Sequence, residues 1–110
     1  MARLTKVYFS RFHRQKPHRS EMTLDEIRKF QVDFNGALES ETVTSIDWQT
    51  DEDLTVSISA ATLSAGIASV LARARIEGQT ARLYCLATLD TGRKLKQWFN
   101  VKVIGEADVR

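Results

Sequence analysis

The feature that most constrains this chain is a two-residue alternation of apolar and polar side chains, which runs from Lys29 to Val103. Successive side chains of a β-strand point to opposite faces, so this period predicts strands that are buried on one side only. Turn-forming residues interrupt the alternation at about 10-residue intervals, which is typical of a β-sandwich. These interruptions include Asn35-Gly36, Asp51-Glu52-Asp53, Glu77-Gly78-Gln79 and Asp90-Thr91-Gly92-Arg93.

Each predicted strand has one apolar face that we expect to lie inside the sandwich. The predicted inward residues are Phe30, Val32, Phe34, Ile46, Trp48, Leu54, Val56, Ile58, Ala68, Val70, Ala72, Ala74, Ile76, Leu83, Cys85, Ala87, Leu89, Leu95, Phe99, Val101 and Val103. Residues 61–76 are also rich in Ala and Leu, as in a helix, but Gly66 and the alternation after it favour a strand. At 110 residues the chain makes one domain, and we predict an all-β fold, an immunoglobulin-like β-sandwich of about six to seven strands.

The first part of the chain has a different composition. Residues 2–19 hold six Lys or Arg residues and no Asp or Glu. Their apolar residues suit one face of a helix or one face of a strand, whereas Lys16-Pro17 favours an extended chain. A capping-box pattern at residues 23–26 allows a single helical turn. We therefore predict an extended basic N-terminal arm over residues 1–22 and the sandwich over residues 23–110.

Charge is segregated along the chain, although the net charge is only +2. Residues 1–20 carry six basic side chains and no acidic one, and residues 30–53 carry seven acidic side chains and no basic one. Residues 73–102 return to seven basic side chains against two acidic ones. Complementary blocks steer association and set its orientation. Such blocks are also common as solvated faces, and the pattern leaves both interpretations open.

Catalysis finds no support in the residues. The sequence contains neither a Gly-x-Ser-x-Gly elbow nor a Gly-rich phosphate-binding loop. His13 and His18 both fall in the predicted arm, where no set of Cys or acidic residues at metal-ligand spacing accompanies them. We expect a protein that is not an enzyme, with no cofactor and no metal.

The acidic and thiol residues of the predicted strands also suit structural roles. Asp47, Asp51 and Asp53 lack the central Gly and terminal Glu of a calcium-binding loop, so we interpret them as parts of a polar turn region. Cys85, the single cysteine, alternates with core residues and excludes an internal disulfide. No apolar run approaches the roughly 20 residues of a membrane span, and no signal peptide is evident, so we expect no membrane partner.

Two parts of the chain are candidates for binding. Trp48 occupies an inward position, whereas Trp98 falls on the Lys96 and Asn100 side of the last strand and is expected to be exposed. The basic arm suits phosphates, an anionic bilayer or an acidic protein surface. Only a protein partner makes use of the acidic block at 30–53. The predicted protein-binding residues are Arg11, Phe12, Arg14, Lys16, Arg19 and Trp98.

Several motifs between residues 26 and 104 occur together. An aromatic strand contains Asp33-Phe34, an acidic loop follows at residues 39–41, and a Thr/Ile/Ser strand ends in Trp48. The Gly78 turn, Thr91-Gly92-Arg93 and the final strand KQWFNVKV complete the set. This arrangement resembles the small immunoglobulin-like virion proteins of tailed bacteriophages that serve as fiber-tail adaptors or related head–tail components.

The chain departs from that family at three points. Phe34 stands where a Trp is frequent, Ala81 stands where a Tyr is common, and the basic arm is longer. These departures leave the fold expectation intact and bear on the position in the virion. The resemblance implies a structural subunit, present as a ring or set of copies, without an active site.

The first interpretation is therefore a non-enzymatic structural protein of a tailed-phage virion, assembled in the host bacterial cytoplasm. It would link tail or fiber to the head–tail connector, form a homo-oligomer and clasp a neighbouring subunit with its arm. A capsid decoration or cement protein of the same fold stays open as an alternative. A nucleic-acid-binding β-module that uses the arm and residues 73–102 is a further alternative, which the acidic block disfavours.

Overall fold

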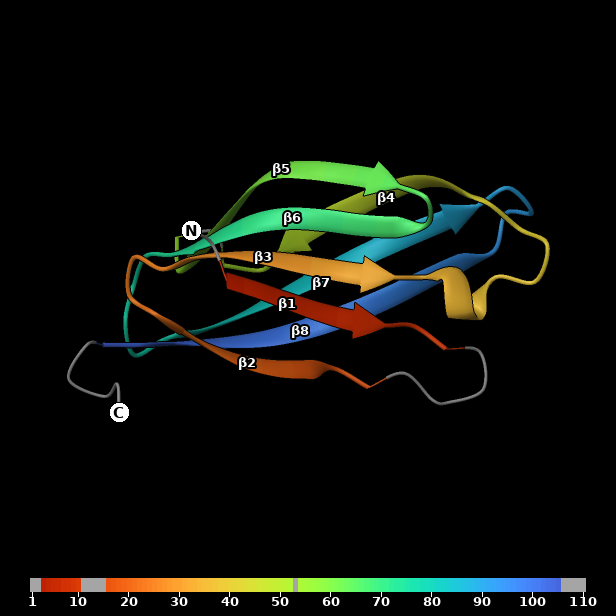
Figure 1. The fold of residues 1–110 in the computed structure, drawn as a ribbon. Coiled ribbons are helices and arrows are strands. Elements are labelled where there is room, and N and C mark those ends of the chain that lie inside the picture. The colour runs from red at the N-terminus through yellow and green to blue at the C-terminus, as the bar shows by residue number, and fades with distance from the viewer. Residues whose placement is uncertain (1–2, 11–15, 53, 106–110) are drawn as a thin grey trace.

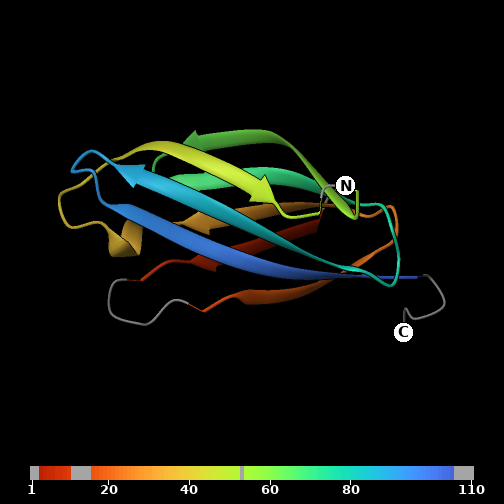
Figure 2. The ribbon, with the colours of Figure 1, turned by 180° about the vertical axis from the view of Figure 1, so that it is seen from behind.

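The computed structural model describes residues 3–10, 16–52 and 54–105, which form two four-stranded β-sheets packed face to face (Figures 1 and 2). The described elements are β1 (Arg3–Tyr8), β2 (His18–Thr23), β3 (Ile27–Asp33), η1 (a 3-10 helix, Asn35–Ala37), β4 (Val43–Thr50), β5 (Val56–Ser64), β6 (Ile67–Ala74), β7 (Thr80–Leu89) and β8 (Lys94–Ile104). The first sheet has the order β1-β3-β6-β5, and the second sheet has the order β2-β8-β7-β4. The predicted all-β, immunoglobulin-like sandwich is confirmed.

The hydrophobic core lies between the two sheets and is centred on aromatic side chains. Phe30 of the first sheet meets Phe99 of the second sheet edge to face, with ring centroids 5.1 Å apart, and Trp48 stacks on Phe99 at 5.9 Å. Burying one such side chain stabilises the fold by about 1.5–3 kcal/mol. The predicted inward residues that are buried are Phe30, Val32, Phe34, Trp48, Val56, Ala68, Val70, Ala72, Ala74, Leu83, Cys85, Ala87, Leu89, Leu95, Phe99, Val101 and Val103.

Three predicted orientations are wrong. Leu54 and Ile76, both expected to point inward, are 68% and 41% exposed, because Leu54 lies in the turn before β5 and Ile76 lies beyond the end of β6. The alternation that places Ile46 and Trp48 inward would put Val43 on the outer face, but Val43 is buried. The register of β4 against β7 shifts between Val43 and Ser45, and a shift of this kind changes which face the next side chain occupies.

The capping-box residues form a tight turn between β2 and β3, and the helical turn that their pattern allows is absent from this described segment. The Glu26 amide donates to the Thr23 carbonyl oxygen at 2.9 Å, and the Thr23 amide donates to Glu26 Oε1 at 3.0 Å. The side-chain half of a capping box is thus present without the helix. Asp25 at the corner of the turn has a φ of 68°, which an Asp tolerates better than most residues.

The described part of residues 1–22 belongs to the sandwich. β1 pairs in parallel with β3 at an edge of the first sheet, and β2 pairs in parallel with β8 at an edge of the second sheet. Val7 packs against the core and Met22 is fully buried. The expectation of an arm lying outside the sandwich is therefore wrong for these residues. Because β1 and β2 belong to the sheets, the described strands number eight and exceed the predicted six to seven.

One buried side chain fastens both of these edge strands. Arg28 of β3 is only 6% exposed. Its Nε donates to Glu26 Oε2 at 2.9 Å, and its Nη1 donates to Ser20 Oγ of β2 at 2.6 Å. The same Nη1 lies 3.4 Å from Thr5 Oγ1 of β1. Arg28 thus connects the two sheets along the side of the sandwich that β1 and β2 form.

Candidate protein-contact face

The outer face of the second sheet carries basic and aromatic side chains from three neighbouring strands. On β8 the outward positions alternate with fully buried ones such as Phe99 and Val101. Asn100 occupies the centre of this face, with Arg19 of β2 opposite it on one side and Arg82 of β7 opposite it on the other. We define the contact face as Arg19, Arg82, Tyr84, Lys96, Trp98, Asn100 and Lys102.

The aromatic part of the contact face is a cross-strand pair covered by cations. Tyr84 of β7 lies opposite Trp98 of β8, and their ring centroids are 4.9 Å apart. The Arg82 guanidinium lies 4.5 Å from the centroid of Trp98, and Lys96 Nζ lies 4.3 Å from that of Tyr84. A cation over an aromatic ring is attracted by about 0.5–1 kcal/mol at an exposed site. The stack therefore holds two charged groups in defined positions on an otherwise solvated sheet.

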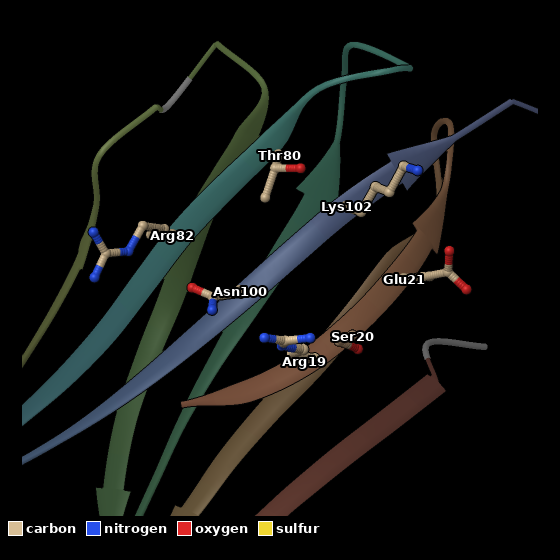
Figure 3. A pocket seen from close by; sticks show the side chains of 7 residues that line it. All are labelled: Arg19, Ser20, Glu21, Thr80, Arg82, Asn100 and Lys102. Atoms are coloured by element: carbon tan, nitrogen blue, oxygen red, sulfur yellow. The ribbon is translucent and has the colours of Figure 1, made fainter. Parts of the chain in front are cut away.

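Beside the stack the face is hollowed, as Figure 3 shows. The hollow has a volume of about 780 Å³ and is lined by Arg19, Ser20, Glu21, Thr80, Arg82, Asn100 and Lys102. Asn100 Oδ1 is buried in the floor without a hydrogen-bond partner among the described residues. A buried acceptor left unpaired is unfavourable, and native structures usually pair it with protein or water.

The predicted binding residues have different positions. Arg11, Phe12 and Arg14 lie outside the described residues. Lys16 is exposed, and its main-chain oxygen accepts a 3.0 Å hydrogen bond from Nε2 of the buried Gln97.

Arg19 and Trp98, far apart in sequence, lie on the same sheet face. Arg19 is exposed and Trp98 is half-buried, on the outer side of β8 as its alternation predicts. The predicted binding residues did not include the other members of the contact face: Arg82, Tyr84, Lys96, Asn100 and Lys102. Their shared outward position on two paired strands was the signal that would have found them.

Part of the acidic block has an internal role. Arg93 in the turn after β7 donates to both carboxylate oxygens of Glu41, at 2.6 and 3.1 Å, and Thr91 Oγ1 donates at 2.7 Å. Hydrogen bonds from Arg93 and then Thr91 lower the pKa of Glu41 from 4.5 to about 2. A second acid, Asp51, accepts a 2.7 Å hydrogen bond from the Arg82 amide. These carboxylates fasten turns to strands within the chain.

The residues considered as candidate nucleophiles or metal ligands pack within the fold. Cys85 is fully buried in the core, and burial raises the pKa of its thiol to about 12, with a smaller contribution from Asp47. His18, which falls in the predicted arm, is half-buried and meets Phe99 edge-on at 5.9 Å. Within residues 3–10, 16–52 and 54–105 no three His, Cys, Asp or Glu residues gather as metal ligands would. The same ranges hold no helix with the length and apolarity of a bilayer-spanning segment.

The fold defines an all-β sandwich protein, and its most distinctive surface among the described residues is a contact face of cations and aromatic rings. A family model described as podophage GP4 fiber-tail adaptor protein gp77 matches residues 22–102. The match spans well over half of the chain, so this chain belongs to the podophage fiber-tail adaptor family. The predicted resemblance is confirmed, and membership implies a structural component of the virion that interacts with other virion proteins. The matched range begins at Met22, so β1 and most of β2 lie before it.

Solved structures resemble the fold at low sequence identity. The cysteine protease inhibitor EhICP2 from Entamoeba histolytica has 14% identity and a TM-score of 0.47, covering 90% of this chain and 97% of its own. The PKD domain from KIAA 1837 protein has 16% identity and a TM-score of 0.48, covering 88% and 89% respectively. Likenesses at this level carry no conclusion about function. A comparison with curated protein sequences finds no match.

Proposed function

We propose that this chain is a non-enzymatic protein that joins the tail or fiber of a phage to its head–tail connector through protein–protein contacts. The observation that carries the proposal is the match of residues 22–102 to the fiber-tail adaptor family. The contact face supports it, because half-buried aromatic rings interleaved with arginine are enriched where proteins meet. The proposed location is the virion, after assembly in the host bacterial cytoplasm.

Within this function we propose protein-contact roles for Arg11, Phe12, Arg14, Lys16, Arg19 and Trp98. Arg19 and Trp98 contribute through the contact face, which Arg82 of β7 extends on the other side of β8 from Arg19. Copies of the chain associate with one another and with other virion proteins. Nucleic acid is not the proposed partner.

The test is to add purified protein to phage particles produced without it and to count attached fibers by electron microscopy. The wild type restores the junction, and Trp98→Ala lowers the restored fraction by at least tenfold because an interface anchor is removed. Leu4→Ala serves as the control, since Leu4 is exposed at 58% on β1 of the other sheet. Restoration by the wild type at any other position on the particle, or none at all, would contradict the proposed function.

A further inference from the structure

The hollow gathers three cations that the described chain leaves without ion pairs. Arg19, Arg82 and Lys102 come from β2, β7 and β8, and none of them forms an ion pair with a described residue. Figure 3 shows Arg19 and Arg82 on either side of Asn100. Adjacent strands lie about 5 Å apart, so the two arginines start about 10 Å from each other across the sheet. Cations at this spacing that form no ion pair favour a ligand with separate negative groups rather than one compact anion.

The neighbouring aromatic stack fixes one of these cations in advance. The central carbon of the Arg82 guanidinium lies 4.5 Å from the centroid of the Trp98 ring, and this contact limits the rotamers of Arg82. A group that is already ordered loses less conformational entropy when a ligand binds. Trp98 and Tyr84 also present apolar ring surface beside the charges. The surface therefore suits a ligand with both carboxylates and apolar parts.

Glu21 distinguishes a peptide from a nucleic acid. It lines the hollow opposite Lys102 of β8, and its carboxylate repels a continuous polyanion. A peptide whose carboxylates are spaced can avoid Glu21 and still reach the arginines.

We propose that the contact face binds an extended acidic segment of another protein, with carboxylates beside Arg19 and Arg82. This inference rests on the proposed adaptor function and names the chemistry of the partner. In an extended segment, every second side chain faces the same way at intervals of about 6.8 Å. Alternate acidic residues of the segment therefore face the cations of the hollow.

The test uses two fluorescein-labelled ten-residue peptides, one alternating Glu with Thr and one alternating Gln with Thr, titrated with the full chain and followed by fluorescence anisotropy. The Glu peptide binds at least tenfold more tightly than the Gln peptide, and its affinity falls as salt is added. Arg82→Glu and Lys102→Glu each lower the affinity for the Glu peptide by tenfold or more. Lys29→Glu changes it by less than about threefold, because Lys29 is exposed on β3 of the first sheet.

Four results would overturn the inference. The first is equal binding of the two peptides, and the second is no binding of the Glu peptide at about 1 mM. The third is unchanged binding of the Glu peptide by folded Arg82→Glu and Lys102→Glu. The fourth is displacement of the labelled Glu peptide by a twelve-nucleotide DNA strand at a lower concentration than unlabelled Glu peptide requires. Self-association that Arg82→Glu abolishes would assign the face to a second copy instead. Near-ultraviolet circular dichroism of each variant confirms that the sandwich is intact. If any of these results is obtained and the wild-type protein still restores fiber junctions, the acidic partner is rejected and the proposed function is retained.

Discussion

Glu41 shows at the scale of one residue how an exposed-looking acidic block stabilises the fold. Its carboxylate accepts hydrogen bonds from Arg93 and Thr91, which connects the loop before β4 to the turn between β7 and β8. The pKa of Glu41 is lowered to about 2 in the folded protein and returns to about 4.5 on unfolding. The folded state thus favours the ionised form, and its contribution is complete above pH 4.5 and is lost as the pH falls to 2.

This linkage predicts a specific pH dependence for Glu41→Gln. The midpoint of thermal unfolding falls less between pH 5 and pH 2 in this variant than in the wild type, because the variant has no Glu41 carboxylate to protonate. Differential scanning calorimetry at several pH values measures it. Glu52→Gln changes an exposed acid in the turn before β5, and its midpoint of thermal unfolding falls with pH as steeply as that of the wild type. Parallel curves for Glu41→Gln and the wild type would show that the Arg93 contact contributes nothing.

At the scale of elements, the unusual feature is that both N-terminal strands join their sheets in parallel and depend on one residue of β3. Arg28→Ala removes the donor to Ser20 of β2, the contact with Thr5 of β1 and the partner of Glu26. The Glu26 side chain is only 12% exposed, and it loses the nearer of its two ion-pair partners; breaking a largely buried pair in this way is strongly destabilising. We predict that the free energy of unfolding falls by about 3 kcal/mol, measured by urea denaturation.

The matched control is Arg73→Ala. Arg73 pairs with Asp25 at 3.5 Å, but the two side chains are 55% and 70% exposed, and such pairs contribute about 0–1 kcal/mol. Amide hydrogen exchange identifies the affected elements: β1 and β2 exchange faster in Arg28→Ala, whereas β7 changes less. If the two variants are equally stable, Arg28 does not hold the edge strands.

Much of the sheet structure is predictable because local alternation reports on burial. Trp48 and Phe99 lie in the core, and Trp98 faces outward, as their positions in the pattern indicate. The pairing of β1 and β2 was not predictable, because parallel partners are distant in sequence and a Lys- and Arg-rich segment is also typical of a solvated arm. Val43 was missed because a register shift interrupts the alternation without a sequence mark such as Gly.

At the scale of the whole molecule, the candidate site needed the topology. Arg19 and Trp98 were predicted separately. Only the strand order β2-β8-β7 places them on one face, with Arg82 of β7 on the opposite side of β8 from Arg19. Sequence spacing gives no sign of this neighbourhood, since residues 19, 82 and 100 belong to three strands. The alternation predicts which way each side chain points but not which strand lies beside it.

The charge segregation predicts self-association that depends on the N-terminal segment. Reversing Arg11, Arg14 and Arg19 to Glu lowers the average solution mass, because complementary charges on neighbouring copies are lost. Light scattering after nuclease treatment measures the mass. Point variants are preferred to removal of residues 1–22, since that truncation would also remove β1, most of β2 and the buried Met22. An unchanged mass in a folded triple variant would contradict a role of these arginines between copies.

The most direct measurement for the central claim is an electron cryomicroscopy reconstruction of phage particles that contain this chain. An adaptor that binds through the contact face gives density for the sandwich where fibers meet the tail, with the outer face of β2, β8 and β7 covered by a neighbouring protein. Trp98 and Arg82 would then be buried in that contact. Density for the sandwich elsewhere in the particle, or at the junction with this face open to solvent, would contradict the account.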